Sequence, residues 1–278
     1  MKKILIIILA GVLSVEAVAQ TEVEADPEMG GRLSFELDKR ITKGLHLYAE
    51  EELRFDDNFA SFNRFHTTLG ATYKVLPYLK LGLGYSLINA YSASESKFNT
   101  PRHRAFFDVT GTYHFGNWQL SLRERVQMTH RTDSFNEWQN PENSWMLKSR
   151  IKLTYKGFRR LQPYCSVELR NTLNAPVISA TYNEASGTWG YYNGSTFTEK
   201  GDEGWFLKGF NGVYLNRVRC TLGANYRIDR RNEVEVYLIA DYSIDKEVDA
   251  NSSGKKLKAY TRETGFTGWV CASYRYSL

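Results

Sequence analysis

Apolar and polar residues alternate over long stretches of this chain, and turn residues separate the stretches. Within 79–88 the odd positions hold Leu or Tyr, and the even positions include Lys80, Gly82 and Gly84. Within 234–242 the even positions hold Val, Leu, Ala or Tyr, and Glu235 and Asp241 lie between them. Successive residues of a strand point to opposite faces, so each strand has one apolar face and one polar face. Repeated along the chain, this pattern predicts an all-β fold, an antiparallel up-and-down transmembrane β-barrel.

The alternation predicts strands at 32–40, 45–56, 63–75, 79–91, 102–115, 118–131, 145–156, 162–174, 216–229, 233–246 and 259–278. Short connections (41–44, 76–78, 116–117, 157–161, 230–232) mostly alternate with longer ones, and bacterial barrels place short turns in the periplasm and long loops outside. These are eleven segments, whereas single-chain bacterial barrels have an even number of strands. We therefore expect twelve strands, with ten as the alternative. The missing strand lies within 205–215 or before Gly30, or one segment is wrongly divided.

The N-terminus has the features of an export signal. Lys2 and Lys3 precede an apolar run at 4–15, and Ala17-Val18-Ala19 forms a small-x-small cleavage site. The apolar run is too short to span a bilayer. We expect a signal peptide at 1–19, a short segment at 20–31 and a barrel at 32–278. The barrel is expected in a bacterial outer membrane, in contact with lipid and lipopolysaccharide, as a monomer.

Composition is consistent with this prediction and adds limits. The mean hydropathy is −0.45, yet 14% of residues are aromatic, as in barrels whose aromatic residues lie at both membrane interfaces. A soluble β-sandwich is the rival, but it would need more turns and fewer buried charges. Without Lys2, Lys3 and Glu16 the formal charge is +4, which gives no reason to expect a nucleic-acid partner. Cys165, Cys220 and Cys271 show no disulfide framework, and we interpret them as small residues of the wall.

Register places opposite charges beside each other on the polar faces. A two-residue turn at Gly116-Asn117 puts Phe115 opposite Trp118 and Asp108 opposite Arg125. The same procedure predicts three further pairs, which are Arg150 with Glu168, Arg227 with Glu235, and Arg32 with Glu50 or Glu52. Such a lumen is either tightly packed with ion pairs or narrowly wet. Glu51 and Glu124 break the pattern, because they fall on the apolar stripes, and a β-bulge is one way to turn either inward.

Several segments together resemble a known family. They are Glu51-Glu52-Leu53-Arg54-Phe55, Asn63-Arg64-Phe65 with Gly70 and Tyr73-Lys74, Gly82, Gly84 and Tyr85, Arg217-Val218-Arg219, 222–227 and 232–237. Over about residues 32–278 the chain resembles the domain-of-unknown-function 2490 family, exported barrels of Bacteroidota and other Gram-negative bacteria. The resemblance implies an outer-membrane barrel and carries over no catalytic residue. The aromatic end of the chain, Tyr274 to Leu278, resembles the C-terminal signal read by the barrel-insertion machinery.

Chemistry is indicated at one place only. The register that pairs Asp108 with Arg125 also places His103 opposite His130 on the outer face, where lipid-modifying enzymes of the outer membrane build His-based sites. Serines for such a site are found at 94, 96 and 134, but no nucleophile motif accompanies them. Metal binding is weaker still, because two histidines need further ligands and Asp56-Asp57-Asn58 is not a full calcium loop. His46, His66 and His114 fall on inward stripes, as do Gly82 and Gly84, which make room in the lumen.

The long loop 175–204 supplies a second alternative. It is rich in small polar residues and contains Tyr182, Trp189, Tyr191, Tyr192 and Phe197, so it is either a binding platform or a self-packed cover. The best interpretation is a non-enzymatic barrel forming a narrow pore or small-solute conduit. The alternatives are a lipid-modifying enzyme and a plugged envelope barrel whose loop binds a ligand. No catalytic, cofactor or metal residue is assigned.

Overall fold

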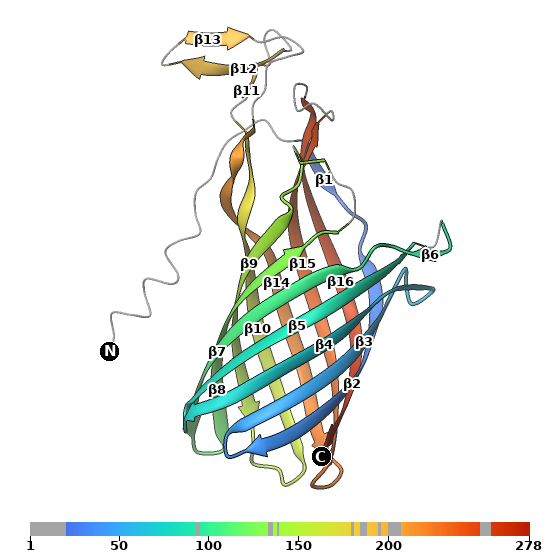
Figure 1. Cartoon of the computed structure of the whole chain (residues 1–278), viewed down its shortest axis with the longest axis vertical. Coiled ribbons are helices and arrows are strands. Elements are labelled where there is room, and N and C mark those ends of the chain that lie inside the picture. Colours follow the sequence, from blue (N-terminus) through green and yellow to red (C-terminus); the bar gives the residue numbers. More distant parts are fainter. Residues whose placement is uncertain are drawn as a thin grey trace.

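The computed structural model describes residues 21–92, 95–132, 136–137, 139–178, 181–183, 188–193, 196–199, 207–250 and 257–278. The predicted signal peptide lies outside these residues. No helix in the described part of the chain is long and apolar enough to cross a membrane. The chain is instead almost entirely strand, and Figure 1 shows a tall barrel with tilted strands.

Eleven strands close the barrel (Figure 1). They are β2 (Glu28–Thr42), β3 (Leu45–Asp56), β4 (Ser61–Leu76), β5 (Leu79–Ser92), β7 (Arg102–Phe115), β8 (Trp118–His130), β9 (Asn143–Tyr155), β10 (Leu161–Ile178), β14 (Leu207–Arg227), β15 (Asn232–Ala250) and β16 (Leu257–Ser277). Each strand pairs antiparallel with the next, and β16 closes the barrel against β2 in parallel. The predicted barrel is confirmed, and the β-sandwich is excluded.

The segment before the barrel supplies one further strand beyond the eleven that close it. A short strand, β1 (Thr21–Glu24), pairs in parallel with β16 at Thr261–Thr264. β2 pairs with the same edge of β16 further along, from Thr267 to Ser277. The twelfth strand of the sheet therefore comes from before Gly30, whereas 207–215 only lengthens β14. Because the ten antiparallel pairings between eleven strands leave the first and last strands running the same way, the expected even, fully antiparallel closure is replaced by one parallel seam.

The two ends of the barrel differ. The short connections 43–44, 77–78, 116–117, 156–160 and 228–231 lie at the end that carries the C-terminus, which we name the turn end (Figure 1). The longer connections lie at the opposite end, the loop end, together with β6 (Lys97–Phe98) and a separate sheet of β11 (Thr181–Asn183), β12 (Thr188–Asn193) and β13 (Thr196–Glu199). Gly44 (φ 87°) and Gly116 (φ 55°) adopt the left-handed backbone that these tight turns require.

Burial is inverted relative to a water-soluble protein. The outward side chains of Leu69, Leu83 and Leu222 are 59%, 61% and 65% exposed. The inward side chains of Gln127 and Asp241 are each only 2% exposed. An apolar outer wall around a polar interior requires hydrocarbon outside, because a continuous exposed apolar surface of this kind is not stable in water.

Aromatic rings gather near both ends of the outer wall. At the turn end, the ring of Tyr155 lies 4.9 Å from Trp118 and 5.1 Å from Phe158, centroid to centroid. At the loop end, the rings of Phe62, Phe65 and Tyr91 pack around Phe98. Aromatic girdles of this kind mark the two interfaces of a membrane-spanning barrel.

Two of the predicted registers are confirmed. Across the Gly116-Asn117 turn, Phe115 lies opposite Trp118 and Asp108 lies opposite Arg125. Across the next turn-end hairpin, Arg150 lies opposite Glu168.

The register of β14 against β15 differs from the prediction. Arg227 lies opposite Glu233 rather than Glu235. The register shifts by two residues because the Asp229 carboxylate accepts hydrogen bonds from the backbone amides of Arg231 and Asn232 at 2.7 and 2.8 Å, which tighten the turn. These bonds hold the pKa of Asp229 below its ordinary value. Since the shift equals two residues, each side chain keeps its predicted face.

The first hairpin also corrects a prediction. Arg32 lies opposite Arg54, and not opposite Glu50 or Glu52. The turn is confined to Lys43 and Gly44, and a bulge between Arg40 and Thr42 shifts the register. As a result, the two cations Arg32 and Arg54 lie side by side in the lumen.

Candidate functional site in the barrel lumen

The Arg125 guanidinium is held in the wall by two groups, the Asp108 carboxylate and the Phe106 ring. Its Nε and Nη2 each donate a hydrogen bond of 2.6 Å to the Asp108 carboxylate, as the register predicted. Its Cζ lies 3.9 Å from the centroid of the Phe106 ring. The ring occupies the space over Gly84, where an added Cβ would meet it at 2.3 Å. The inward glycine therefore makes room for this stack, as its position predicted.

Other ion pairs follow the register only in part: Asp241 is paired with Arg219, which lies directly opposite it, whereas Glu168 is not paired with the residue opposite it. Glu168 accepts a hydrogen bond from Arg123 at 2.7 Å, although Arg150 is the residue directly opposite it. Asp241 accepts from Arg219 at 2.6 Å and from Arg217 at 3.2 Å. A narrow, curved wall brings inward side chains from different strands together, so that long Arg side chains reach past their nearest neighbours.

Cations occupy two continuous rows across neighbouring strands. The first, which we name the four-strand cation row, contains Arg125 on β8, Lys148 on β9, Arg170 on β10 and Arg217 on β14, each opposite the next. The second, the three-strand cation row, contains Arg32, Arg54 and Arg64 on β2, β3 and β4. Like charges directly opposite one another are destabilising, so each row requires compensation.

The compensation by carboxylates is incomplete. Within the residues that the structure describes, no carboxylate lies within 4.0 Å of Arg32, Arg64, Arg104, Lys148, Arg150 or Arg170. Arg32 is 5% exposed, its Cζ lies 4.2 Å from the ring centroid of Trp269, and its Nε has no hydrogen-bond partner. These six lumen cations are therefore left without a matching carboxylate among the described side chains.

A polar pocket opens at the loop end, above the four-strand cation row. Its volume is ≈ 560 Å³. Residues of five strands and of the loop after β8 surround it, among them Arg170, Asn174, Tyr214, Asn216 and Asp245. Pockets of this size with a few convergent polar groups are typical of small-molecule sites.

Comparison with known proteins identifies the family. The family model described as "Protein of unknown function (DUF2490)" matches residues 32–251. The chain belongs to the DUF2490 family. No curated protein gives a significant sequence match to this DUF2490 member.

Solved structures with a similar fold include a porin and an outer-membrane protein. A NanC porin is 11% identical over 90% of this chain and 97% of that chain, with a TM-score of 0.42. OmpT of Vibrio cholerae is 12% identical over 84% of this chain and 64% of that chain, with a TM-score of 0.34.

The histidines that the sequence singled out lie together on the outer face of the DUF2490 barrel. The rings of His103 and His130 are 6.5 Å apart, centroid to centroid, and Nδ1 of His130 lies 3.0 Å from Oδ1 of Asn143. Tyr85 hydrogen-bonds to His103. Ser94 and Ser134 lie outside the described residues. The described neighbours of the two rings are thus an amide, a phenol and the Glu142 carboxylate, which lies 3.8 Å from Nδ1 of His130, and none of them is the hydroxyl or thiol nucleophile of a catalytic triad.

The inward histidines join the polar network of the lumen. Nδ1 of His46 lies 2.9 Å from the Asp38 carboxylate, and Nδ1 of His66 lies 3.4 Å from a guanidinium nitrogen of Arg54. His114 lies opposite Gln119 near the turn end. Across the part of the chain that the structure describes, no three His, Cys, Asp or Glu side chains gather as a metal site.

The two outward glutamates each have a hydroxyl partner on the neighbouring strand. Glu51 accepts a hydrogen bond from Thr67 at 2.7 Å, and Glu124 accepts one from Ser149 at 2.6 Å. Neither residue is at a bulge, so neither turns inward as the sequence had left open. The hydroxyl groups thus donate to each outward carboxylate a hydrogen bond that the hydrocarbon of the lipid cannot donate.

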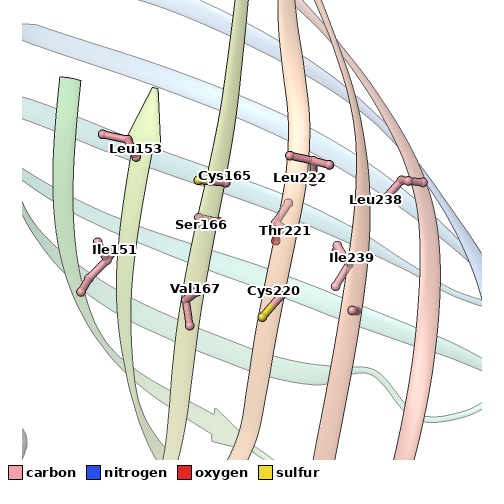
Figure 2. Close-up of a pocket in the computed structure, with 11 residues that line it drawn as sticks. Ile151, Leu153, Cys165, Ser166, Val167, Cys220, Thr221, Leu222, Leu238 and Ile239 are labelled. Carbon is pink, nitrogen blue, oxygen red and sulfur yellow. The ribbon is translucent and has the colours of Figure 1, made fainter. Parts of the chain in front are cut away.

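Two of the three cysteines face the membrane. Cys165 and Cys220 are exposed and unpaired, and they line a hollow of ≈ 550 Å³ in the outer wall (Figure 2). Cys271, by contrast, is buried. The hollow exists because small residues on β10, β14 and β15 lie between larger ones such as Val167 and Leu222. Its lining is apolar, as the lipid-facing wall requires.

The aromatic loop forms the small sheet at the loop end. Its register places Tyr182 opposite Trp189 and Tyr192 opposite Phe197. The binding platform that these residues suggested stays a prediction, because their side chains are not among those described.

Replacing Gly84 with alanine tests the packing beneath Arg125. The new Cβ collides with the Phe106 ring, so we expect the G84A barrel to lose about 1–3 kcal/mol of unfolding free energy. The matched control is G82A on the same inward face of β5, where the nearest atom is 3.4 Å from an added Cβ. Urea unfolding in lipid vesicles, followed by tryptophan fluorescence, measures both. Equal stability of the two variants would contradict the assigned packing.

Proposed function

We propose that this protein is an outer-membrane conduit for small anionic solutes. The observation that supports it is the set of lumen cations without carboxylate partners within the described residues: Arg32, Arg64, Arg104, Lys148, Arg150 and Arg170. Removing a charged group from water costs several kcal/mol unless an opposite charge or solvent compensates it. Water and mobile anions are the compensation available to an open lumen, whereas a dry plugged barrel offers none.

The conduit is narrow. Inward side chains at its middle, among them Thr68, Gln127 and Glu168, are 9% exposed or less, so little free surface remains along the wall. A barrel of eleven strands lies between small filled barrels and the wide porins of sixteen or more strands. We therefore infer passage of single small ions or solutes rather than general diffusion.

Single-channel recording of the refolded protein in a planar bilayer tests this function. We expect small, reproducible conductance steps, and in a KCl gradient a reversal potential displaced toward that of chloride, because the unmatched lumen charge is positive. Arg104→Glu replaces a positive charge in the lumen with a negative one and should move the reversal potential toward that of potassium. Lys39→Glu on the outer side near the turn end is the control and should leave selectivity unchanged. A protein that is folded by heat-modifiable migration but electrically silent would overturn the proposal.

The cellular setting is part of the proposal. The short turns face the periplasm, the aromatic C-terminal strand is the segment that the insertion machinery reads, and lipopolysaccharide surrounds the loop end of a single copy. The apolar outer wall and the two aromatic girdles support this placement. Catalysis is not part of the proposed role. If His103→Ala with His130→Ala altered the lipid A or phospholipid composition of the membrane, the lipid-modifying alternative would replace the conduit.

A further inference from the structure

We propose that Lys148 and Arg170 form a discrete binding site for one oxyanion group, a carboxylate or a phosphate, at the base of the loop-end pocket. This inference names a ligand class for the conduit and rests on the proposed function for the route by which that ligand arrives. It goes beyond general attraction to a positive lumen, because it assigns one location, two binding residues and one positioning residue.

Geometry brings the two cations together. Lys148 and Arg170 are directly opposite on the adjacent strands β9 and β10, and both face the lumen. Opposed side chains in an antiparallel pair start from Cβ atoms about 4.5–5.5 Å apart, so one oxyanion can contact both. Arg170 lines the loop-end pocket, and Met146, one inward position above Lys148, lines it too. Arg170 is thus reached from the pocket, and Lys148 lies directly opposite it, one inward position below the lining.

The neighbouring cations are already neutralised, which sets this pair apart. Arg125, which flanks Lys148, is bound by Asp108, and Arg217, which flanks Arg170, lies 3.2 Å from Asp241. The closest acidic neighbours have partners of their own, since Glu168 is bound by Arg123 and Asp245 is hydrogen-bonded to Asn216. In the described barrel, the two central members of the four-strand cation row are the members that lack a carboxylate.

A buried amide fixes the Arg170 guanidinium. Nε of Arg170 donates a hydrogen bond of 2.6 Å to Oδ1 of Asn216, and Nδ2 of Asn216 donates one of 3.0 Å to the backbone carbonyl of Ile244. Asn216 is 3% exposed and lies at the register shift where β14 gains a residue against β10. A bulge of this kind aims a side chain that a regular strand would point elsewhere. The bond through Nε leaves the terminal nitrogens of the guanidinium to a ligand.

The chemistry of the pair selects an oxyanion. Arg presents a planar fork of donors that matches the two oxygens of a carboxylate or phosphate, and Lys adds a compact charge with three donors. A halide has no pair of oxygens to match the fork. The bound group would also supply the negative charge that the row lacks at this point.

Isothermal titration calorimetry of the folded full-length protein in detergent tests the site, with sodium phosphate and sodium acetate as probes at constant chloride concentration. We expect saturable binding of one anion per chain. K148Q and R170Q should each weaken it about tenfold or more, since each removes a charge-assisted hydrogen bond. K80Q, which removes an exposed cation near the turn end, should bind as the unchanged protein does. K148R keeps the charge and should retain binding, which separates loss of the site from loss of the fold.

The outcomes distinguish the site from the conduit. Binding of phosphate alone, or of both anions, supports the site and identifies its ligand class. Binding that does not saturate, or that is equal in R170Q and K80Q, overturns it. A protein that conducts anions without saturable binding would support the proposed function and overturn this site. A protein that binds the anion but never conducts would support the site and overturn the proposed function.

Discussion

Asp241→Asn should unfold more easily than any other single conservative change considered for this barrel. Asp241 is 2% exposed, and its carboxylate accepts hydrogen bonds from both Arg217 and Arg219. The asparagine has nearly the same shape but no charge, so both guanidinium groups lose their counter-ion at once. Leaving one partner of a buried ion pair unmatched typically costs about 3–5 kcal/mol, and water in the lumen favours the lower end of that range.

Urea unfolding in phospholipid vesicles measures the loss, and Glu233→Gln is the matched control. Glu233 lies near the turn end and its carboxylate is 3.5 Å from Arg275, which also has Glu36 at 2.8 Å. Its neutralisation should cost less than about 1 kcal/mol, as for an exposed pair. If the two variants are equally stable, the Asp241 cluster is not a structural centre of the wall. Added phosphate that restores D241N would show that a mobile anion can replace the carboxylate.

The fold could be predicted from the sequence because strand alternation and turn chemistry are local. The face of a residue depends only on whether its position is odd or even, so Arg125 and Asp108 were placed inside correctly. Where a glycine fixed a two-residue turn, as at Gly116, the register followed from the turn alone. The bounds of the central strands, such as Leu45–Asp56 and Arg102–Phe115, agree with the alternation for the same reason.

The registers that failed depend on details that alternation does not contain. Arg32 lies opposite Arg54 because a bulge after Arg40 shifts the register of the first hairpin. Arg227 lies opposite Glu233 because hydrogen bonds to the Asp229 side chain tighten the turn after β14. The parallel pairing of β16 with β2 could not be predicted from the sequence either. The expectation of an even number of strands came from known barrels and not from the residues of this chain. Local pattern gives the face of each residue, whereas neighbours across strands depend on turn geometry.

The candidate site required the closed wall. Pairing by register predicted a lumen of matched Arg–carboxylate pairs, with Arg150 bound to Glu168. In the structure Arg123 takes that carboxylate, and unmatched cations remain. No sequence rule states which of several arginines reaches a given carboxylate across a curved lumen. The basic residues of the inward stripes were a usable signal: 148, 150, 152 and 123, 125 are all Lys or Arg at alternate positions.

Leu222→Arg should show whether the outer wall lies in hydrocarbon. Leu222 is 65% exposed, faces outward and lies five residues from the end of β14 at the turn end. An arginine on the lipid face near the bilayer midplane costs about 2–4 kcal/mol, and the cost falls to about 0–1 near the interfaces. Ile228→Arg, in the turn that follows β14, is therefore the control and should be nearly neutral.

The comparison of these two variants separates the barrel in a membrane from the same barrel in water. In water both positions are exposed surface, where a substitution usually changes stability by less than about 0.5 kcal/mol. A depth-dependent penalty in vesicle unfolding requires a nonpolar medium around the middle of the wall. A nonpolar medium outside the wall also supports the proposed conduit, because the unmatched lumen cations can then be compensated by water and anions only from within the lumen.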